Sequence, residues 1–465
     1  MGRIIIAGTH SGCGKTTITM GIIRALSEKG FKVIPWKTGP DYIDPGFHSA
    51  ASGYKCRNLD TMMLEKDTVL ELLERQDSSA DISVIEGVMG LYDSASADDE
   101  RGSAAHLAKM TNTPVILVID AKAMARSAAA IALGFRNYDK EVPLAGFIFN
   151  RTGSERHYEI LKESVEKAVN LPVIGHIKKN PELSIAERHL GLIPAWEKEK
   201  TEETIIKAAD AVKESINLDL FTDIAQGAGR LPPFKSKLFG GAKLQVEEKP
   251  KVKIAAALDD AFCFYYDDNF DLLRYYGAEI EYFSPLKDRQ LPENTDALYL
   301  GGGYPELFAE KLSANKELIN QIREKAQNGM PVLGECGGFM YLCSSITDTD
   351  DRNYPMCALL PGRTVMGKKL RSLGYCTSVN NTKNILGPEG TEIKGHMFHW
   401  AVLENVPEKT EKAFTIIKGN KKEKGGLINK RVLGSWVHFH FASNASAAEN
   451  FVLSALEYKK EKERN

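Results

Sequence analysis

The chain has 465 residues, enough for about three domains of ordinary size or two large ones. Hydrophobic residues make up 43% and charged residues 26%, a balance that excludes a chain disordered over most of its length. Lys and Arg number 60 against 62 Asp and Glu, so no basic excess points to nucleic acid or to an anionic membrane surface.

The sequence contains no segment that we expect to cross a membrane. Its longest apolar stretch, Val115–Phe135, includes Asp120, Lys122 and Arg126. The first residues show no signal-peptide pattern, and the seven cysteines are scattered without a CxxC pair. We therefore expect a cytoplasmic protein without a disulfide framework or structural zinc.

The first half alternates short apolar runs with helical patterns. This alternation predicts an α/β domain in which a doubly wound parallel sheet is covered by helices on both faces. The predicted strands are Ile4–Ala7, Val33–Trp36, Ile82–Glu86, Val115–Ile119, Leu144–Asn150 and Pro172–His176, and the predicted helices are Thr16–Lys29, Thr68–Arg75, Ala121–Arg136 and Glu155–Val169.

A phosphate-binding loop is predicted between the first strand and the first helix. Glycines there let backbone N–H groups close on phosphate oxygens, and the helix N-terminus adds positive potential. The GxxxxGK[ST] pattern expects glycine at Thr9, but this chain has it one residue earlier. Lys15 would reach the β- and γ-phosphates and Thr16 would bind Mg²⁺. The predicted nucleotide-binding residues of the loop are Gly8, Ser11, Gly12, Gly14, Lys15, Thr16 and Thr17.

Acidic segments follow the second and third predicted strands, at residues 41–45 and 86–93. Plain turn chemistry would explain either segment alone. Both, however, follow the carboxyl ends of parallel strands, where ligands bind in such sheets. The predicted metal ligands are Thr16, Asp41 and Glu86, and the residues expected near the reacting carboxylate are Tyr42, Asp44 and Asp93.

A stretch rich in glycine, proline and charge, residues 226–250, predicts a linker. A second strand–helix series then begins, and residues 354–433 alternate as antiparallel strands do. The predicted strands of this series are Val252–Leu258, Glu279–Phe283, Ala297–Leu300 and Pro331–Gly334. We therefore predict a nucleotide-binding domain at 1–225, the linker, a second α/β domain at 251–445, and a helix and tail at 446–465.

Cys336 stands between an apolar strand and a predicted helix, flanked by small residues. This is the pattern of a nucleophile elbow, in which the helix N-terminus is expected to lower the pKa of the thiol. A second glycine-rich turn, Gly301–Gly303, follows another strand. We therefore predict an oxyanion hole in which the backbone N–H groups of Gly303 and Gly337 bind the negative oxygen. Because these features occur together with a downstream histidine, we interpret Cys336 as a nucleophile.

Two histidine pairs in the last third invite a metal hypothesis. His438 and His440 stand two apart on a predicted strand and so share a face, and His396 and His399 form an HxxH pair. No third group of ligands accompanies them, so we favour roles outside metal binding.

The segment Lys37–His48, with Glu86–Asp93, resembles the signatures of cobyrinic acid a,c-diamide synthases. The shifted phosphate loop resembles that of dethiobiotin synthetases in the same superfamily. Asn150 matches the position at which dethiobiotin synthetases read adenine. The resemblance covers essentially the whole chain and implies MgATP-dependent activation of a carboxylate, most simply as an acyl phosphate.

The second half resembles a class I glutamine amidotransferase domain. The resemblance implies that Cys336 attacks the glutamine amide to form a thioester, with His438 as the base. A Glu normally lies two residues after that histidine. Here the position is His440, and the cobyrinate synthase branch also lacks that Glu, which leaves open what orients His438. Met397 stands where the family pattern leads us to expect Glu, which leaves the role of the 396–399 segment open.

The resemblance implies that ammonia from glutamine converts the a and c side-chain carboxylates of cobyrinic acid to amides in cobalamin synthesis. The expected small molecules are cobyrinate, glutamine and ATP, with Mg²⁺. Hydrogenobyrinate and nickel-sirohydrochlorin remain alternative rings. A partition-type ATPase acting on a protein partner is the alternative of another class. The sequence leaves the oligomeric state open.

Overall fold

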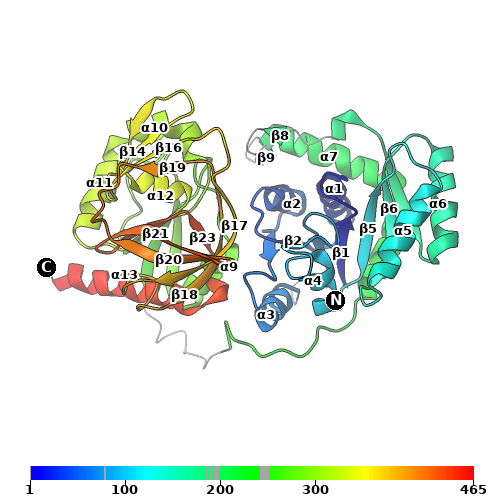
Figure 1. The fold of residues 1–465 in the computed structure, drawn as a ribbon, viewed down its shortest axis with the longest axis horizontal. Helices are drawn as coiled ribbons and strands as arrows, with labels where there is room; N and C mark the ends of the chain where they lie inside the picture. The colour runs from blue at the N-terminus through cyan, green and yellow to red at the C-terminus, as the bar shows by residue number, and fades with distance from the viewer. Residues whose placement is uncertain are drawn as a thin grey trace. The chain divides into compact units, whose positions relative to one another are not determined.

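The computed structural model describes residues 2–77, 80–183, 187–188, 191–192, 198–240 and 251–464. The chain divides into two compact units, Met1–Ser236 and Lys237–Asn465 (Figure 1), and each is described by itself. The division falls within the predicted linker 226–250, of which residues 241–250 lie outside the described part of the chain.

The first unit is built from a seven-stranded sheet and the helices that cover it. Its strands are β1 (Gly2–Gly8), β2 (Val33–Thr38), β3 (Arg57–Leu59), β4 (Ile82–Glu86), β5 (Val115–Asp120), β6 (Leu144–Thr152) and β7 (Val173–Lys178), with a separate hairpin of β8 (Glu187–Arg188) and β9 (Gly191–Leu192). Its helices are α1 (Lys15–Glu28), α2 (Asp44–Ser52), α3 (Lys66–Asp77), α4 (Ala104–Thr111), α5 (Ser127–Tyr138), α6 (Glu155–Val169), α7 (Lys198–Ser215) and α8 (Leu218–Gln226).

The strand order is β3-β2-β4-β1-β5-β6-β7, and every neighbouring pair is parallel. The carboxyl ends of β1, β2, β4 and β6 therefore meet at one edge of the sheet, as the sequence predicted. In this register Glu86 lies beside Lys37 of β2 and Ile6 of β1. The edge thus brings the acidic segments next to the loop that follows β1.

Several elements of the first unit differ from the sequence prediction, among them the edge strand β3 and the β8–β9 hairpin, which were not predicted. The acidic segment after β2 is not only a turn, because α2 begins at Asp44 with Pro45 in its first turn, where proline's fixed φ suits a helix. Helix α5 begins at Ser127 rather than Ala121, after a turn in which Ala123 has a φ of 58°. The helices α4, α7 and α8 were not predicted.

The second unit is also an α/β structure. Its strands are β10 (Val252–Ala257), β11 (Ala278–Phe283), β12 (Ala297–Leu300), β13 (Val332–Glu335), β14 (Ser345–Thr347), β15 (Asn353–Pro355), β16 (Arg363–Val365), β17 (Ser372–Asn380), β18 (Glu392–His399), β19 (Val402–Glu404), β20 (Lys412–Lys418), β21 (Lys421–Asn429), β22 (Val432–Ser435) and β23 (Val437–Phe439). Its helices are α9 (Asp267–Tyr275), α10 (Ala309–Ala314), α11 (Lys316–Gln327), α12 (Gly337–Leu342) and α13 (Ser446–Arg464).

The main sheet of this unit has ten strands in the order β11-β10-β12-β13-β22-β21-β20-β17-β18-β23. The first five are parallel and the remaining pairs are antiparallel, so the change from a strand–helix series to antiparallel strands is as predicted. A four-stranded sheet, β15-β14-β16-β19, lies apart from it. The α/β class predicted for both units is confirmed.

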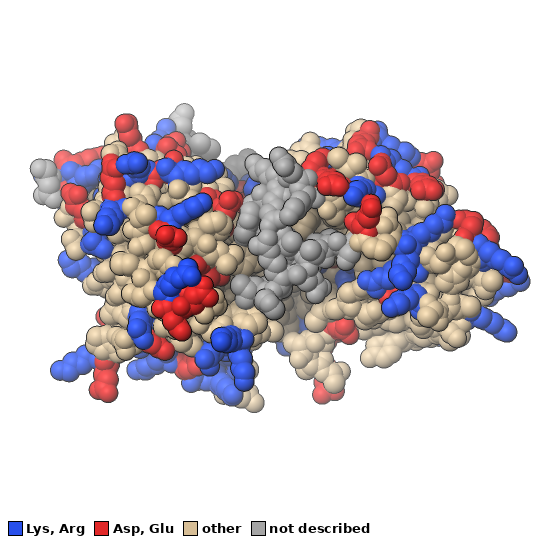
Figure 2. Space-filling view, turned by 90° about the horizontal axis from the view of Figure 1, so that it is seen from above, with Lys and Arg blue, Asp and Glu red and all other residues tan. Residues whose placement is uncertain are grey.

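Charges of both signs are interspersed over the face drawn in Figure 2, which fits the near-neutral composition. Within the described ranges, no helix combines the length and apolar character needed to cross a bilayer.

Candidate functional sites

The loop after β1 wraps the start of α1 in the way that a phosphate-binding loop requires. Gly8, the glycine that stands one position early, packs directly against the Cys13 sulfur, so a side chain there would collide with it. Lys15 is 6% exposed and its Nζ donates to the His10 carbonyl oxygen over 3.2 Å, which holds the ammonium under the loop. Ser11 and Gly12 lie exposed at the crest.

Asn150 and Arg151, at the carboxyl end of β6, hold the other side of this loop. The Asn150 amide donates to the Cys13 carbonyl oxygen over 2.8 Å. Arg151 donates to the Gly12 carbonyl oxygen over 2.9 Å and pairs with Asp120 over 2.5 Å. The predicted adenine-reading residue therefore lies against the phosphate loop, and Arg151 is a neighbour that the sequence analysis missed.

Thr16 and Glu86 meet at the centre of this edge, where the Thr16 hydroxyl donates to Glu86 Oε1 over 2.9 Å. Glu86 is fully buried. Its carboxylate also accepts from the Lys37 ammonium over 3.0 Å and contacts the ring of His48. Thr17 points elsewhere, since its hydroxyl donates to the Leu183 carbonyl oxygen over 3.3 Å.

Three carboxylates lie around the buried ammonium group of Lys37. Its Nζ lies 2.5 Å from Asp44, 3.0 Å from Glu86 and 3.9 Å from Asp41. Burial works against the ammonium, but the three carboxylates outweigh it and raise the pKa of Lys37. For Glu86 burial likewise works against the charge, yet Lys37 and His48 hold its pKa well below the usual range.

Asp41 has a different electrostatic environment from Glu86. Burial and the neighbouring Asp44 carboxylate raise its pKa to about 7, against the opposing effect of Lys37. The cluster offers carboxylate oxygens of the kind that Mg²⁺ prefers, and Lys37 contacts two of its three carboxylates, those of Asp44 and Glu86, directly. The structure thus brings the predicted ligands Thr16, Asp41 and Glu86 to one place.

The loop after β4 lies against the phosphate loop, because the Leu91 N–H donates to the Gly8 carbonyl oxygen over 2.8 Å. The exposed Asp93 closes its own turn by accepting from the Gly90 N–H over 2.7 Å. Tyr42 lies in the segment between β2 and α2, beside Asp41. Of the three predicted substrate-region residues, Asp44 contacts Lys37 in the carboxylate cluster and Tyr42 is next to Asp41 in the chain, whereas the Asp93 carboxylate is occupied by its own turn.

In the second unit, Cys336 stands at the sharp turn between β13 and α12. Its φ of 45° and ψ of −100° are unusual for a residue with a side chain and are typical of a strained nucleophile elbow. The thiol is 7% exposed and donates to the Phe398 carbonyl oxygen over 3.8 Å. The predicted elbow is present.

The expected lowering of the thiol pKa is wrong for this structure. Burial, together with the Glu306 carboxyl group, raises the pKa of Cys336 to about 12, although the Gly337 N–H acts in the opposite direction. Helix α12 has only six residues, so its dipole is short. The resting thiol is therefore protonated and needs a base.

The glycine-rich turn lies directly beside the elbow. The Gly338 N–H donates to the Gly301 carbonyl oxygen over 2.8 Å. A Cβ built on Gly337 would lie 3.1 Å from the Gly303 nitrogen, which places the two predicted oxyanion-hole residues next to each other. Gly302 packs against the ring of His438, so any side chain at position 302 would collide with the expected base.

His438 lies on β23, directly opposite His396 of β18 in the antiparallel register. Burial, with a contribution from His396 and His399, lowers the pKa of His438 to about 3, so its imidazole is neutral near pH 7. His399 donates from Nδ1 to the Ala401 carbonyl oxygen over 2.8 Å if that nitrogen carries the proton, and its ring stacks on Trp436. The 396–399 segment thus borders both Cys336 and His438.

His440, at the position of the Glu of class I amidotransferases, directly follows the end of β23. Its ring stacks on Tyr266 with 4.5 Å between centroids, and neither ring nitrogen has a hydrogen-bond partner among the described residues. The described residues also contain no group of three or more His, Cys, Asp or Glu side chains placed to hold a metal ion.

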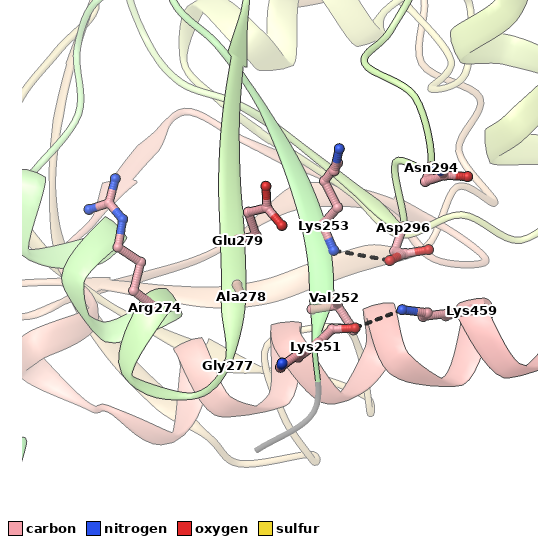
Figure 3. A pocket seen from close by; sticks show the side chains of 10 residues that line it. All are labelled: Lys251, Val252, Lys253, Arg274, Gly277, Ala278, Glu279, Asn294, Asp296 and Lys459. Carbon is pink, nitrogen blue, oxygen red and sulfur yellow. Dashed lines mark hydrogen bonds between the residues drawn. The ribbon is translucent and has the colours of Figure 1, made fainter. Parts of the chain in front are cut away.

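A cavity of about 530 Å³ in the second unit lies at the amino-terminal ends of β10 and β11 (Figure 3). The Lys253 ammonium lies 2.6 Å from Glu281. Lys459 donates to the Lys251 carbonyl oxygen over 2.8 Å (Figure 3). Cys336 follows the carboxyl end of β13, so the cavity is at the opposite edge of the parallel strands.

Family comparisons find a match in each of the two units. Residues 4–193 match the CobQ/CobB/MinD/ParA nucleotide binding domain, and residues 253–446 match the CobB/CobQ-like glutamine amidotransferase domain. The chain is 43% identical over 455 residues to a cobyrinate a,c-diamide synthase of Dehalococcoides mccartyi, covering 97% of each chain. The chain belongs to the cobyrinate a,c-diamide synthase family.

Other relatives in this family are similarly close. The cobyrinate a,c-diamide synthase of Priestia megaterium is 41% identical over 99% of this chain and 98% of its own. That of Thermoplasma volcanium is 42% identical over 99% of both. The family resemblance predicted from the sequence is confirmed. The partition-type alternative is not supported, because the cobyrinate a,c-diamide synthase relatives match along both units.

Proposed function

We propose that this protein uses glutamine and MgATP to amidate the a- and c-carboxylates of cobyrinate in cobalamin biosynthesis. One observation carries the proposal: a single chain holds both a phosphate loop beside a carboxylate cluster and a cysteine elbow beside a histidine. The assignment of cobyrinate as the ring substrate rests on the relatives named cobyrinate a,c-diamide synthase.

In the glutaminase reaction, the Cys336 thiol gives its proton to the neutral imidazole of His438 as sulfur attacks the glutamine side-chain carbonyl. The negative oxygen that forms is bound by the backbone N–H groups of Gly303 and Gly337. His438 then returns the proton to the departing nitrogen, which leaves as ammonia. Water hydrolyses the glutamyl thioester, and glutamate is released with the thiol restored.

In the synthetase reaction, a ring carboxylate oxygen attacks the γ-phosphorus of ATP and ADP leaves, which forms an acyl phosphate. Ammonia then attacks the acyl carbon and displaces inorganic phosphate, so that the amide forms with loss of one proton from the nitrogen. Lys15 and the backbone N–H groups of residues 8–17 bind the phosphates, while Asn150 lies where the adenine is expected. Tyr42, Asp44 and Asp93 border the reacting carboxylate.

Mg²⁺ is part of the proposal, with Thr16, Asp41 and Glu86 as its ligands. The three side chains fit this role because each carries an oxygen atom of the kind that Mg²⁺ prefers: Thr16 contacts Glu86, and Asp41 and Glu86 both face Lys37. When bound, the ion neutralises phosphate charge. Lys37 and His48 contact Glu86 and hold its carboxylate toward Thr16.

The expected location of the protein is the cytoplasm.

The decisive experiment is the mass of the product after incubation with cobyrinate, glutamine and MgATP. Each amidation exchanges a hydroxyl for an amino group, so we expect two such exchanges. Parallel incubations with hydrogenobyrinate and with nickel-sirohydrochlorin test the alternative rings. No mass change with cobyrinate, together with amidation of another ring, would reject the assigned substrate and leave the chemistry standing.

A further inference from the structure

The strand that carries His438 is held by a group of buried polar side chains, Asn269, Tyr299 and Glu335, which we call the polar clamp. None of the three belongs to the proposed catalytic set. They lie on α9, β12 and β13, respectively, and all three side chains are almost completely buried. Burying such groups is costly unless they are paired, so their hydrogen bonds indicate what they hold in place.

Asn269 binds the backbone on both sides of His440. Its amide N–H donates to the Phe439 carbonyl oxygen over 2.8 Å, and its side-chain oxygen accepts from the Phe441 N–H over 2.8 Å. The side chain thus pairs with the backbone as a neighbouring strand would. His438 directly precedes the first of these anchored residues.

Glu335 links the same segment to the elbow. Its Oε1 accepts from the Phe439 N–H over 3.4 Å and from the Tyr299 hydroxyl over 3.1 Å. The Asn269 amide also reaches the Tyr299 hydroxyl over 3.2 Å, which closes the set. Because Glu335 precedes Cys336 in the chain, one side chain connects the residue before the nucleophile with the residue after the expected base.

This chain has His440 at the position where class I amidotransferases have a Glu that orients the base. His440 makes no hydrogen bond with the described residues, so another group must orient His438. We propose that Asn269 and Glu335 are positioning residues that orient His438 toward Cys336 by fixing the backbone of residues 439–441. This inference rests on the proposed glutaminase function.

The test is steady-state glutaminase kinetics of the full-length Asn269→Ala variant. We expect kcat to fall about tenfold to a hundredfold, with the KM for glutamine changed by less than about threefold, because the base is misplaced while the glutamine contacts remain. Ammonia-dependent amidation should be unchanged. Asn315→Ala is the matched control, since the Asn315 amide also donates to two carbonyl oxygens, those of Pro285 and Asp288. It should keep glutaminase activity.

Glu335 provides an independent pair of variants. Glu335→Gln keeps an oxygen that accepts from Phe439 N–H and should retain kcat within about twofold, whereas Glu335→Met removes it and should lower kcat as Asn269→Ala does. If Asn269→Ala does not fold, this pair decides. Any of three results would overturn the proposed role of the clamp. These are an unchanged kcat in Asn269→Ala, equal losses in Asn269→Ala and Asn315→Ala, and equal activity of the two Glu335 variants. If the wild-type protein releases no glutamate, the proposed function itself fails.

Discussion

Thr16, at the start of α1, donates its hydroxyl hydrogen to Glu86, at the end of β4, over 2.9 Å. The two residues are 70 positions apart, and the parallel register of β1 and β4 brings them together. A hydroxyl and a carboxylate at the base of a phosphate loop suit a divalent cation bound with a nucleotide, and this is the role that we propose for the two residues.

Thr16→Ala and Lys15→Ala should abolish amidation with either glutamine or ammonium as the nitrogen source, because both donors depend on an activated carboxylate. Product mass measured with each donor checks this. Thr19→Val is the matched control: Thr19 is buried in the same helix, and its hydroxyl makes no hydrogen bond with the described residues. Amidation with ammonium by Thr16→Ala and Lys15→Ala at saturating ATP would remove the nucleotide assignment.

Glu86→Gln and Asp41→Asn should lower turnover by several powers of ten, as loss of a metal ligand or of phosphoryl-transfer positioning does. Initial rates of ADP formation with cobyrinate and ammonium measure the effect. Asp81→Asn should have little effect, since Asp81 lies at the other end of β4 and accepts from the Lys32 N–H. Wild-type rates in both Glu86→Gln and Asp41→Asn would argue against the carboxylate cluster as the reaction site.

Cys336→Ser should lose glutamine-dependent amidation and keep ammonium-dependent amidation. The thiol is needed only to release nitrogen, while the carboxylate is activated in the other unit. Amide formation with each nitrogen source is the measurement, and Cys343→Ala is the control because Cys343 is a buried cysteine of the same unit. Equal loss with both nitrogen sources would show that the thiol is structural or that the two reactions are not separable.

The alkylation rate of Cys336 should rise about tenfold per unit between about pH 7 and pH 10 without a plateau. Burial raises the pKa of the thiol to about 12, so the reactive thiolate stays a minor species that grows with pH over this range. His438, with its pKa lowered to about 3, is neutral over the same range and offers no imidazolium partner. Site-specific mass spectrometry after iodoacetamide treatment measures the rate. A plateau near neutral pH would instead indicate a thiolate–imidazolium pair.

Much of the fold could be predicted because its signals are local. The buried strands of the first sheet are short runs of Ile and Val, and Ile82–Glu86 and Ala297–Leu300 have the predicted bounds. Helix α2 was missed because Pro45 and Gly46 look like a turn, although proline suits the first turn of a helix. His48 was missed as a partner of Glu86 for the same reason, since it lies on that helix.

The electrostatics and the clamp could not be predicted from local patterns. The pKa of Cys336 depends on its burial and on Glu306, and the sequence indicates only the helix that follows the thiol. Asn269 and Phe441 are 172 positions apart, and no spacing rule connects them. Such contacts follow from the packing of α9 against the segment after β23, which exists only in the folded chain.

The last prediction is that His438, and not His440, is the glutaminase base. His438 lies on β23 with its ring packed against Gly302, the neighbour of the oxyanion residue Gly303. His440 is directed against Tyr266, on which its ring stacks. His438→Asn should therefore remove glutaminase activity and leave ammonia-dependent synthesis intact.

His440→Asn should cost less, about tenfold, because it removes a ring that supports the segment rather than the group that takes the thiol proton. Glutamate release by both variants, measured at the same pH, decides between the two histidines. The loss in His440→Asn should also leave a functioning base, so its remaining activity should keep the pH dependence of the wild-type protein. If His440→Asn were inactive and His438→Asn active, the base would be His440, and the assignment of the base from the amidotransferase resemblance would be displaced by two residues.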